Sequence, residues 1–378
     1  MMKPIIRTIT GFISEKDFSS FDRLLKDILV LKNIFRSSGY EIQTVRITTD
    51  ILEGNQNIDS LENSEKFLQK LENTNDIFIY HLGSIDNENI LDQEKENELV
   101  SFFINHKKSF LTIDAGNKKE SYTLCLSGAR MCKQIAQKNP FECRRFAVYA
   151  GVTTSTPFYP ASRVFNNSMK ISVGCQCANL AVEEAVNSGK DVTSFEKRLK
   201  ERMEKEFTDL ENLIPFAIKS NFIGFDTSLA PFPSTEHSIA NAIELVLGKP
   251  FGSSGTLSTC RVLTRVMQEN NIKKTGLCGL MLPVVEDNIL AKRGIEGCYT
   301  WKELLLFSSV CATGLDTVPI SGKISIKDLA DCYCDLATLA VKLQKPLSAR
   351  LFIEPNKLPG ETIKYDWEFA CESPVFKI

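Results

Sequence analysis

Histidine is scarce in this sequence, which contains three in 378 residues. A metal site built from three histidines would need all of them, and they stand far apart in the sequence. His81 closes the apolar run 77–80, His106 lies in a charged patch, and His237 follows Pro-Ser-Thr-Glu at a predicted helix start. Only His81, at a predicted strand end, is a candidate acid or base, and the alternative is a hydrogen-bonded core histidine.

The sequence also lacks long apolar runs and an excess of charge. No run reaches the roughly 18 consecutive apolar residues that a membrane-spanning helix needs. The first residues, Met-Met-Lys-Pro-Ile-Ile-Arg, show no secretory signal, so we expect a cytoplasmic protein. With 45 Lys and Arg against 47 Asp and Glu, the net charge of −2 gives no general attraction to nucleic acid or membrane, which favours a small-molecule partner.

Cysteine spacing of the zinc-binding kind is absent as well. Twelve cysteines are spread along the chain, and the closest pairs, 175/177 and 332/334, are Cys-x-Cys and not Cys-x-x-Cys. Dispersed cysteines in a long chain without a secretory signal indicate reduced thiols, most of them small buried apolar side chains.

Apolar, strand-like runs alternate with helical patterns, which indicates an α/β fold. Several runs have nearly continuous apolar cores, as parallel strands covered on both faces do. No repeat or linker divides the chain, so we expect one domain with two halves, about 1–175 and 176–378. The ten predicted strands are residues 5–12, 41–47, 76–81, 109–114, 145–151, 170–174, 222–226, 274–282, 313–319 and 348–353.

Two predicted helices have clear boundaries. Ser14 begins an amphipathic stretch that closes near Gly39 and should pack on the sheet. The longest helix is predicted over 193–218, with Pro215 placed to kink or end it, and its apolar stripe suits a crossover or a homodimer contact. The polar segments 51–75 and 86–98 are predicted to be solvated loops or surface helices.

The first candidate site follows the predicted strand 222–226. Asp226 and Ser228 stand at its carboxyl end, and Pro231 and Pro233 stiffen the loop that follows. Ligands of α/β proteins bind beyond the carboxyl ends of strands, so these two polar groups are candidate catalytic residues. The alternative is an aspartate that caps its own turn.

The second candidate is the loop Gly252-Ser253-Ser254-Gly255-Thr256, which precedes a helical pattern. Backbone N–H groups of such a loop can hold an anion. The loop has neither the lysine nor the spacing of a P-loop, so it is not a nucleotide fingerprint. A plain helix cap is the alternative.

The third candidate is the acid pair Glu286 and Asp287, directly after the predicted strand 274–282. Two adjacent carboxylates in a closed site repel each other, which raises a pKa or recruits a cation such as Mg²⁺. Asp287 could instead be the N-cap of a helix that starts at Asn288.

The fourth candidate lies around Gly314, where Cys311 and Asp316 flank a turn into an apolar strand. Cys311 is a nucleophile only if a neighbour lowers its pKa, and the sequence assigns no such partner. Arg46, Arg145 and Arg350 fall within or beside predicted strands, where each guanidinium needs either an acid partner or a substrate carboxylate or phosphate.

These stretches together resemble the family called domain of unknown function 711. The resemblance rests on Asp-Thr-Ser-Leu-Ala-Pro-Phe-Pro (226–233), Phe-Gly-Ser-Ser-Gly-Thr (251–256), Gly-Leu-Met-Leu-Pro-Val-Val-Glu-Asp (279–287) and Cys-Ala-Thr-Gly-Leu-Asp-Thr-Val-Pro (311–319). Residues 6–10, 145–150, 156–160 and 345–351 are similar too, so nearly the whole chain is covered.

The resemblance implies a closed ten-stranded α/β barrel with helices outside, related to pyruvate formate-lyase and the anaerobic ribonucleotide reductases. Those enzymes carry a glycyl radical near the C-terminus. This chain offers only Gly360 in Leu-Pro-Gly-Glu there, without their Arg-Val-x-Gly-Tyr signal, so we expect no glycyl radical. Some bacterial members have a histidine where this chain has Ser254, so a histidine mechanism does not carry over.

The leading hypothesis is an enzyme that acts on a small anionic metabolite at the barrel mouth by acid–base, hydrolytic or lyase-type chemistry. A divalent cation (Mg²⁺, Mn²⁺ or Ca²⁺) is one option for the acids, and a non-catalytic binding or assembly protein and a Cys311 thiol enzyme are the alternatives. Candidate catalytic residues are His81, Asp226, Ser228, Glu286, Cys311 and Asp316; candidate metal ligands are Asp226, Glu286, Asp287 and Asp316; candidate anion-binding residues are Arg46, Gly252, Ser253, Ser254, Gly255, Thr256 and Arg350.

Overall fold

The computed structural model describes residues 2–53, 61, 64–88, 92–165 and 168–378. Within them, nine strands form one mostly parallel sheet in the order β7-β6-β1-β2-β3-β4-β5-β9-β8. Only the pairs β1–β6 and β5–β9 are antiparallel. The strands are β1 Ile5–Phe12, β2 Ile42–Thr48, β3 Ile79–Ile85, β4 Ser109–Asp114, β5 Phe146–Ala150, β6 Lys170–Gln176, β7 Phe222–Asp226, β8 Gly314–Ser321 and β9 Leu347–Glu354, with a separate pair β10 Thr362–Ile363 and β11 Ser373–Pro374.

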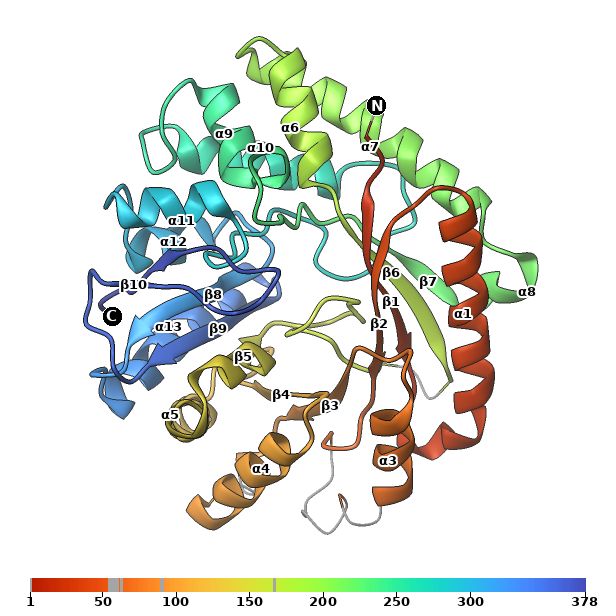
Figure 1. The fold of residues 1–378 in the computed structure, drawn as a ribbon, viewed down its shortest axis with the longest axis vertical. Helices are drawn as coiled ribbons and strands as arrows, with labels where there is room; N and C mark the ends of the chain where they lie inside the picture. Colours follow the sequence, from red (N-terminus) through yellow and green to blue (C-terminus); the bar gives the residue numbers. More distant parts are fainter. Residues whose placement is uncertain (1, 54–60, 62–63, 89–91, 166–167) are drawn as a thin grey trace.

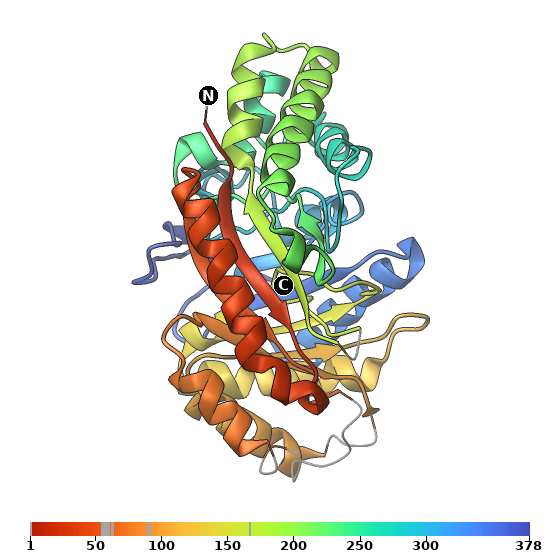
Figure 2. The same ribbon diagram turned by 90° about the vertical axis from the view of Figure 1, so that its right-hand side faces the viewer.

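Helices lie outside the sheet, as Figures 1 and 2 show. In the described part of the chain, no helix is long and apolar enough to span a membrane. The helices are α1 Phe21–Ser37, α3 Glu65–Asn73, α4 Gln93–Asn105, α5 Tyr122–Lys138, α6 Ala178–Asn187, α7 Val192–Asn212, α8 Phe216–Lys219, α9 Ile239–Leu247, α10 Thr256–Gln268, α11 Asn288–Ile295, α12 Trp301–Phe307 and α13 Ile326–Leu343, with 3-10 turns η1 Glu15–Ser20, η3 Pro140–Arg145 and η4 Thr235–His237.

The α/β prediction is confirmed, and nine of the ten predicted strands coincide with β1 to β9 within a few residues. The helix predicted from Ser14 is present as η1 followed by α1, whose apolar face is fully buried. Parts of the predicted polar segments, residues 54–60, 62–63 and 89–91, lie outside the described residues. The remainder of those segments includes α3 and the start of α4.

The tenth predicted strand, 274–282, is not a strand, and a closed ten-stranded barrel is not confirmed. Its backbone turns at Gly276 and Cys278, where φ is +86° and +44°. Side chains take the N–H groups that a ladder would use: Asp226 accepts those of Leu277 and Cys278, and Ser228 accepts that of Gly279. The segment therefore makes only isolated bridges to the chain around it.

Those bridges nevertheless place this segment between the two edges of the sheet. Lys274 bridges Phe225 in β7, and Pro283 bridges Asp316 in β8. The two edge strands, β7 and β8, stand first and ninth in the sheet order, so the sheet must curve strongly for one short segment to reach both. Figure 1 shows this curvature, with β8 and β9 on one side and β1, β6 and β7 on the other.

The predicted long helix is shorter than expected. Helix α7 ends at Asn212, and Pro215 precedes the separate short helix α8. Its apolar stripe, including Leu199 and Phe207, is buried inside the chain, where the ring of Phe207 contacts that of Phe225 at 5.3 Å. This stripe serves the core, so it gives no support to the predicted homodimer contact.

Candidate anion-binding site

A small cavity, called the arginine chamber below, lies where several strands of the curved sheet converge. Its volume is about 40 Å³, and its polar lining comes from β1, β2, β6, β8 and β9 and from the loop before α11. The lining residues are Arg7, Arg46, Phe158, Tyr159, Gln176, Ala230, Pro231, Met281, Pro283, Glu286, Thr313, Asp316 and Arg350.

Arg350 joins the two carboxylates of the chamber. Its Nε donates to Oδ1 of Asp316 at 2.8 Å, and its Nη2 donates to Oε1 of Glu286 at 2.9 Å. Burial lowers the pKa of Arg350, but Asp316 and Glu286 outweigh burial and raise the pKa above its usual value. The guanidinium is therefore held charged between two acids.

A β-bulge aims Asp316 at this arginine. The parallel register of β8 and β9 shifts so that Asp316 and Thr317 together stand opposite Arg350. Thr317 has a φ of +45°, which is rare for a β-branched residue. Its hydroxyl accepts the N–H of Val285 at 3.3 Å, so the same bulge also positions the loop that carries Glu286.

A chain of amides positions Arg7. Nη1 of Arg7 donates to Oε1 of Gln43 at 2.9 Å, Nε2 of Gln43 donates to Gln176, and Gln176 donates to the carbonyl of Pro231. Nη2 of Arg7 lies 3.5 Å from Oε2 of Glu286, which is a long ion pair. Burial lowers the pKa of Arg7, and Glu286 counteracts part of that effect.

Arg46 is the exception among the buried arginines of this chain. Arg7, Arg145 and Arg202 each pair with a carboxylate, whereas Arg46 pairs with none of the described acids although it is only 7% exposed. Its Nε donates to Thr44 at 3.3 Å, and its guanidinium lies 5.1 Å from the ring centre of Tyr159. Its two terminal nitrogens make no hydrogen bond or ion pair with the described residues.

The electrostatic surroundings of Arg46 disfavour its charged form. Burial lowers the pKa of Arg46 to about 9, and the neighbouring charge of Arg7 contributes to the decrease. Arg46 is still protonated at neutral pH. Three guanidiniums against two carboxylates leave the chamber with one positive charge, and Arg350 already holds both acids. An anion would supply the partner that Arg46 lacks.

A wider cavity, called the vestibule below, adjoins the chamber. Its volume is about 300 Å³, at the lower end of the range for small-molecule sites, and it shares Arg7, Arg46, Tyr159 and Arg350 with the chamber. Six of its lining residues are cationic, five are aromatic and one is acidic. The lining consists of Arg7, Arg46, Phe78, Ile79, Lys107, Phe110, Phe141, Arg144, Arg145, Tyr159, Arg350, Trp367 and Glu368.

Some cations of the vestibule are already paired with protein groups, and Lys107 is not. Nη1 of Arg145 donates to the carbonyl of Ser109 at 2.5 Å, and Glu142 pairs with both Arg144 and Arg145. Lys107 is exposed and has no ion pair within the part of the chain that the structure describes. Its ammonium group is therefore available to a ligand.

The family model for the description "Uncharacterised ACR (DUF711)" matches residues 2–366. The chain belongs to the DUF711 family. Among the similar proteins, the "UPF0210 protein" of Pyrobaculum arsenaticum is 28% identical over 244 residues, 61% of this chain and 54% of that protein. That of Lactiplantibacillus plantarum is 23% identical over 282 residues, 71% of this chain and 62% of that protein. The chain spans about half the length of the first of these relatives.

Four predicted site residues of this DUF711 chain meet in the chamber: Arg46, Glu286, Asp316 and Arg350. Arg145 lines only the vestibule. Arg7 was missed, although it satisfies the rule that selected Arg46, since it is an arginine inside an apolar strand. Gln43 and Gln176 carry no comparable signal, because strand glutamines are common at exposed positions as well.

Asp226 and Ser228 lie apart from this set and line neither cavity. Asp226 is fully buried, and its Oδ1 accepts the hydroxyl and N–H of Ser228 at 2.5 and 3.0 Å. Its Oδ2 accepts the hydroxyl of Thr156 and the N–H of Leu277. Burial raises the pKa of Asp226, and these hydrogen bonds oppose the increase. The aspartate holds the irregular segment 276–279 against the end of β7.

Asp287 caps two helices at once. Its Oδ1 accepts the N–H groups of Ile289 and Leu290 at the start of α11. Its Oδ2 accepts those of Ile239 and Ala240 at the start of α9. The N-cap alternative is thus what the structure shows for this residue.

The four predicted metal ligands do not form one cluster. Asp226 and Asp287 direct their oxygens at backbone N–H groups, while Glu286 and Asp316 bind Arg350. No group of three or more His, Cys, Asp or Glu side chains suited to a metal ion occurs in the residues described. These side chains therefore do not fit a shared divalent cation.

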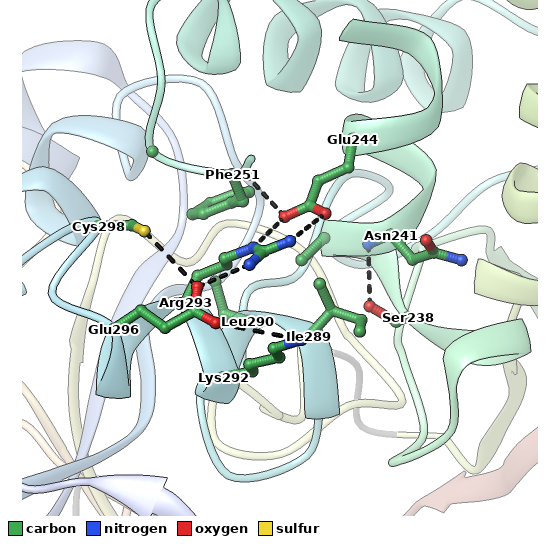
Figure 3. Close-up of polar contacts among 12 residues, drawn as sticks. Ser238, Asn241, Glu244, Phe251, Ile289, Leu290, Lys292, Arg293, Glu296 and Cys298 are labelled. Atoms are coloured by element: carbon green, nitrogen blue, oxygen red, sulfur yellow. Dashed lines mark hydrogen bonds and ion pairs between the residues drawn. The ribbon is translucent and has the colours of Figure 1, made fainter. Parts of the chain in front are cut away.

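The loop 252–256 packs against another part of the structure. Its own bonds use several N–H groups: that of Gly252 donates to the Thr256 hydroxyl, and that of Ser253 donates to Pro250. Beside it, Glu244 accepts the N–H of Phe251 and a paired contact from Arg293 (Figure 3). Neither Ser254 nor Gly255 lines the chamber or the vestibule, so the loop and Arg350 do not share a site.

His81 and Cys311 are buried beside the site without lining it. Nδ1 of His81 accepts the N–H of Gly83 and Nε2 contacts the Thr112 hydroxyl, and its ring packs on those of Phe110 and Tyr159. Burial lowers the pKa of His81 to about 3, so the imidazole is neutral. It packs on the rings of Phe110 and Tyr159, which line the vestibule. The Sγ of Cys311 accepts the N–H of Gly314.

Proposed function

We propose that the arginine chamber binds the carboxylate or phosphate of a small metabolite and that Glu286 acts on the bound molecule as an acid or base. The observation that carries the proposal is the buried guanidinium of Arg46, which has no carboxylate partner. A buried cation of this kind destabilises the fold unless something compensates for it, and a ligand anion is the simplest compensation.

Glu286 is the better of the two acids for chemistry. Its Oε2 faces Arg7 over 3.5 Å, so that contact is loose, and an incoming anion would compete for the same arginine. Arg7 and Arg350 would then stabilise negative charge that develops as Glu286 removes a proton from the ligand. No step of this proposal passes through a metal ion, because the acids do not fit one.

Binding without turnover is the second candidate function. The observation in its favour is that Arg350 holds both carboxylates at 2.8 and 2.9 Å, an arrangement that also suits a purely structural ion-pair network. The closed ten-stranded barrel is likewise proposed, on the three bridges of segment 274–283 to its neighbours. A cytoplasmic location and a homodimer stay predictions.

Calorimetric titration with acetate, succinate, citrate, phosphate and pyrophosphate tests the binding step. We expect Arg46→Gln to weaken the tightest of these probes about tenfold or more, as the loss of a charge-assisted hydrogen bond of about 1.5–3 kcal/mol does. Arg265→Gln is the matched control, since Arg265 pairs with Glu196 outside both cavities. Equal affinity in wild type and Arg46→Gln rules the site out.

Exchange of carbon-bound hydrogen separates the two candidates. The tightest carboxylate probe is incubated with the protein in D₂O and followed by proton NMR. Exchange that Glu286→Gln abolishes while calorimetric binding persists supports acid–base chemistry. Binding to the wild type without exchange at any probe carbon supports the second candidate instead.

A further inference from the structure

We infer that the natural ligand is a planar ring that carries two anionic groups, one bound at Arg46 in the chamber and the second at the outer end of the vestibule. This inference rests on the proposed anion site and adds the substrate class. It comes from the composition of the vestibule, where six cations and five aromatic rings surround about 300 Å³.

The ring subsite is formed by two pairs of contacting side chains. Phe110 and Tyr159 meet edge-on with ring centres 5.3 Å apart, and His81 contacts both. Phe141 and Trp367 meet edge-on at 5.9 Å. Side chains that are already fixed by one another lose little entropy when a ligand ring packs on them, and a flat aromatic ligand matches their shape.

Several contacts fix these rings in place. The hydroxyl of Tyr159 donates to the carbonyl of Ile47 at 2.7 Å, which holds one ring between the chamber and the vestibule. Phe141 has two further contacts, with the ring of Tyr365 stacked at 5.6 Å and the guanidinium of Arg144 at 4.3 Å from its ring centre. The wall is therefore built before any ligand arrives.

The candidates for the second anion site are Lys107 and Arg144, which both line the vestibule. Lys107 is exposed and lacks an acid partner among the described residues, and Arg144 shares Glu142 with Arg145. Glu368 is the one acid among the described lining residues, and the cations that have no ion pair within the described structure are Arg46 and Lys107, one for each proposed anion site. A ligand with one charged end would leave one of these two cations without a partner, whereas a ligand with two would neutralise both.

The segment after residue 366 supplies part of this wall. Trp367 and Glu368 line the vestibule, and the ring of Phe369 lies 4.0 Å from the guanidinium of Arg7. The N–H of Cys371 donates to the carbonyl of Val285 at 2.9 Å, beside the loop of the chamber. Since the family match ends at 366, this wall is where ligand preference can differ between this chain and its relatives.

Intrinsic fluorescence gives a direct test, because the sequence has two tryptophans and only Trp367 lines the cavity. A Trp301→Phe variant leaves Trp367 as the single reporter. The probes are acetate, benzoate and the 1,3- and 1,4-benzenedicarboxylates. We expect the dicarboxylates to change the Trp367 emission and to bind more tightly than benzoate, and benzoate to bind more tightly than acetate.

Two variants assign the ends of the ligand. Lys107→Gln should weaken a benzenedicarboxylate about two- to fivefold, as exposed charge pairs do, and leave benzoate unchanged. Lys108→Gln is the matched control, since Lys108 donates to the carbonyl of Thr74 and does not line the vestibule. Trp367→Ala should weaken every ring-bearing probe about two- to tenfold and leave acetate unchanged.

The outcomes distinguish the two proposals. If the probes bind in a way that depends on Arg46 but Trp367 emission and the Lys107→Gln affinities do not change, the planar dianion is wrong and the anion site stands. If no probe responds to Arg46→Gln, the anion site is wrong and the inference built on it fails as well.

Discussion

Replacement of Arg46 by methionine should make the ligand-free protein more stable while it removes anion binding. Mutations of buried residues usually destabilise a protein, so the expected sign is unusual. It follows from a charge that is buried without an acid partner. Methionine keeps an unbranched apolar stem and removes that charge.

The pKa gives the size of the effect. The folded-state pKa of Arg46 is about 9, below that of arginine in an unfolded chain, so the unfolded state binds the proton more tightly. The destabilisation is fully present below pH 9 and disappears only as pH rises above that value. At about 1.36 kcal/mol per pKa unit, the shift corresponds to a few kcal/mol at neutral pH.

The substitution also removes two favourable contacts of Arg46, which reduces the expected gain in the free energy of unfolding. The ring of Tyr159 stabilises the cation by about 0.5–2 kcal/mol and the long hydrogen bond to Thr44 by less. A net gain of about 1–3 kcal/mol remains. With an unfolding entropy of about 2.1 cal/mol/K per residue, such a gain raises Tm by roughly 1–4 °C for a chain of this length.

Urea unfolding followed by circular dichroism and scanning calorimetry measure this change, on protein refolded from urea to remove any bound anion. Arg163→Met is the control, because Arg163 pairs with Glu53, Asp86 and Asp114 and its loss should cost about 3–5 kcal/mol. An Arg46→Met protein that is less stable than wild type refutes the reasoning, as it would show that the guanidinium is already compensated within the fold.

Four further results are expected. Asp226→Ala should lower the free energy of unfolding in urea by about 3–5 kcal/mol, because it leaves several buried N–H groups without an acceptor. Asp331→Ala on the surface should lower it by less than about 1 kcal/mol. Lowering the pH from 6.5 towards 4 should destabilise the wild type more than it destabilises His81→Gln. The reason is that the folded-state pKa of about 3 keeps His81 neutral, while the same histidine in the unfolded chain takes up a proton. His106→Gln is the control. Addition of Mg²⁺, Mn²⁺ or Ca²⁺ should give no concentration-dependent rise in Tm, and a saturable rise would restore the metal hypothesis. Iodoacetamide should label the exposed Cys298 before the buried Cys311, and the reverse order in peptide mass mapping would restore the thiol-enzyme alternative.

The strands were predictable because most of them carry short, mainly apolar runs bounded by turn residues, which indicate both their type and their position. The segment 274–282 carries such a run and still does not form a strand. Its N–H groups bind the side chains of Asp226 and Ser228, residues some fifty positions earlier in the sequence. Local pattern cannot reveal a competitor for backbone hydrogen bonds that comes from so far along the chain.

The candidate site shows the same limit. All four acids singled out in the sequence are buried, but Asp226 and Asp287 bind backbone N–H groups while Glu286 and Asp316 bind arginines. All four are buried carboxylates, and only their tertiary contacts separate the two roles. Arginine was the more informative residue type, because a guanidinium buried in a strand needs either an acid partner or a ligand anion.

The pairing of the other buried arginines also supports the proposed anion site in the chamber. Where this chain buries an arginine for stability, it places a carboxylate beside it, as Glu142 beside Arg145 and Glu206 beside Arg202. Asp316 and Glu286 could serve Arg46 in the same way, but the bulge in β8 directs Asp316 to Arg350 instead. The fold thus leaves the charge of Arg46 without an acid partner and with a lowered pKa, and perturbed groups of this kind cluster at functional sites.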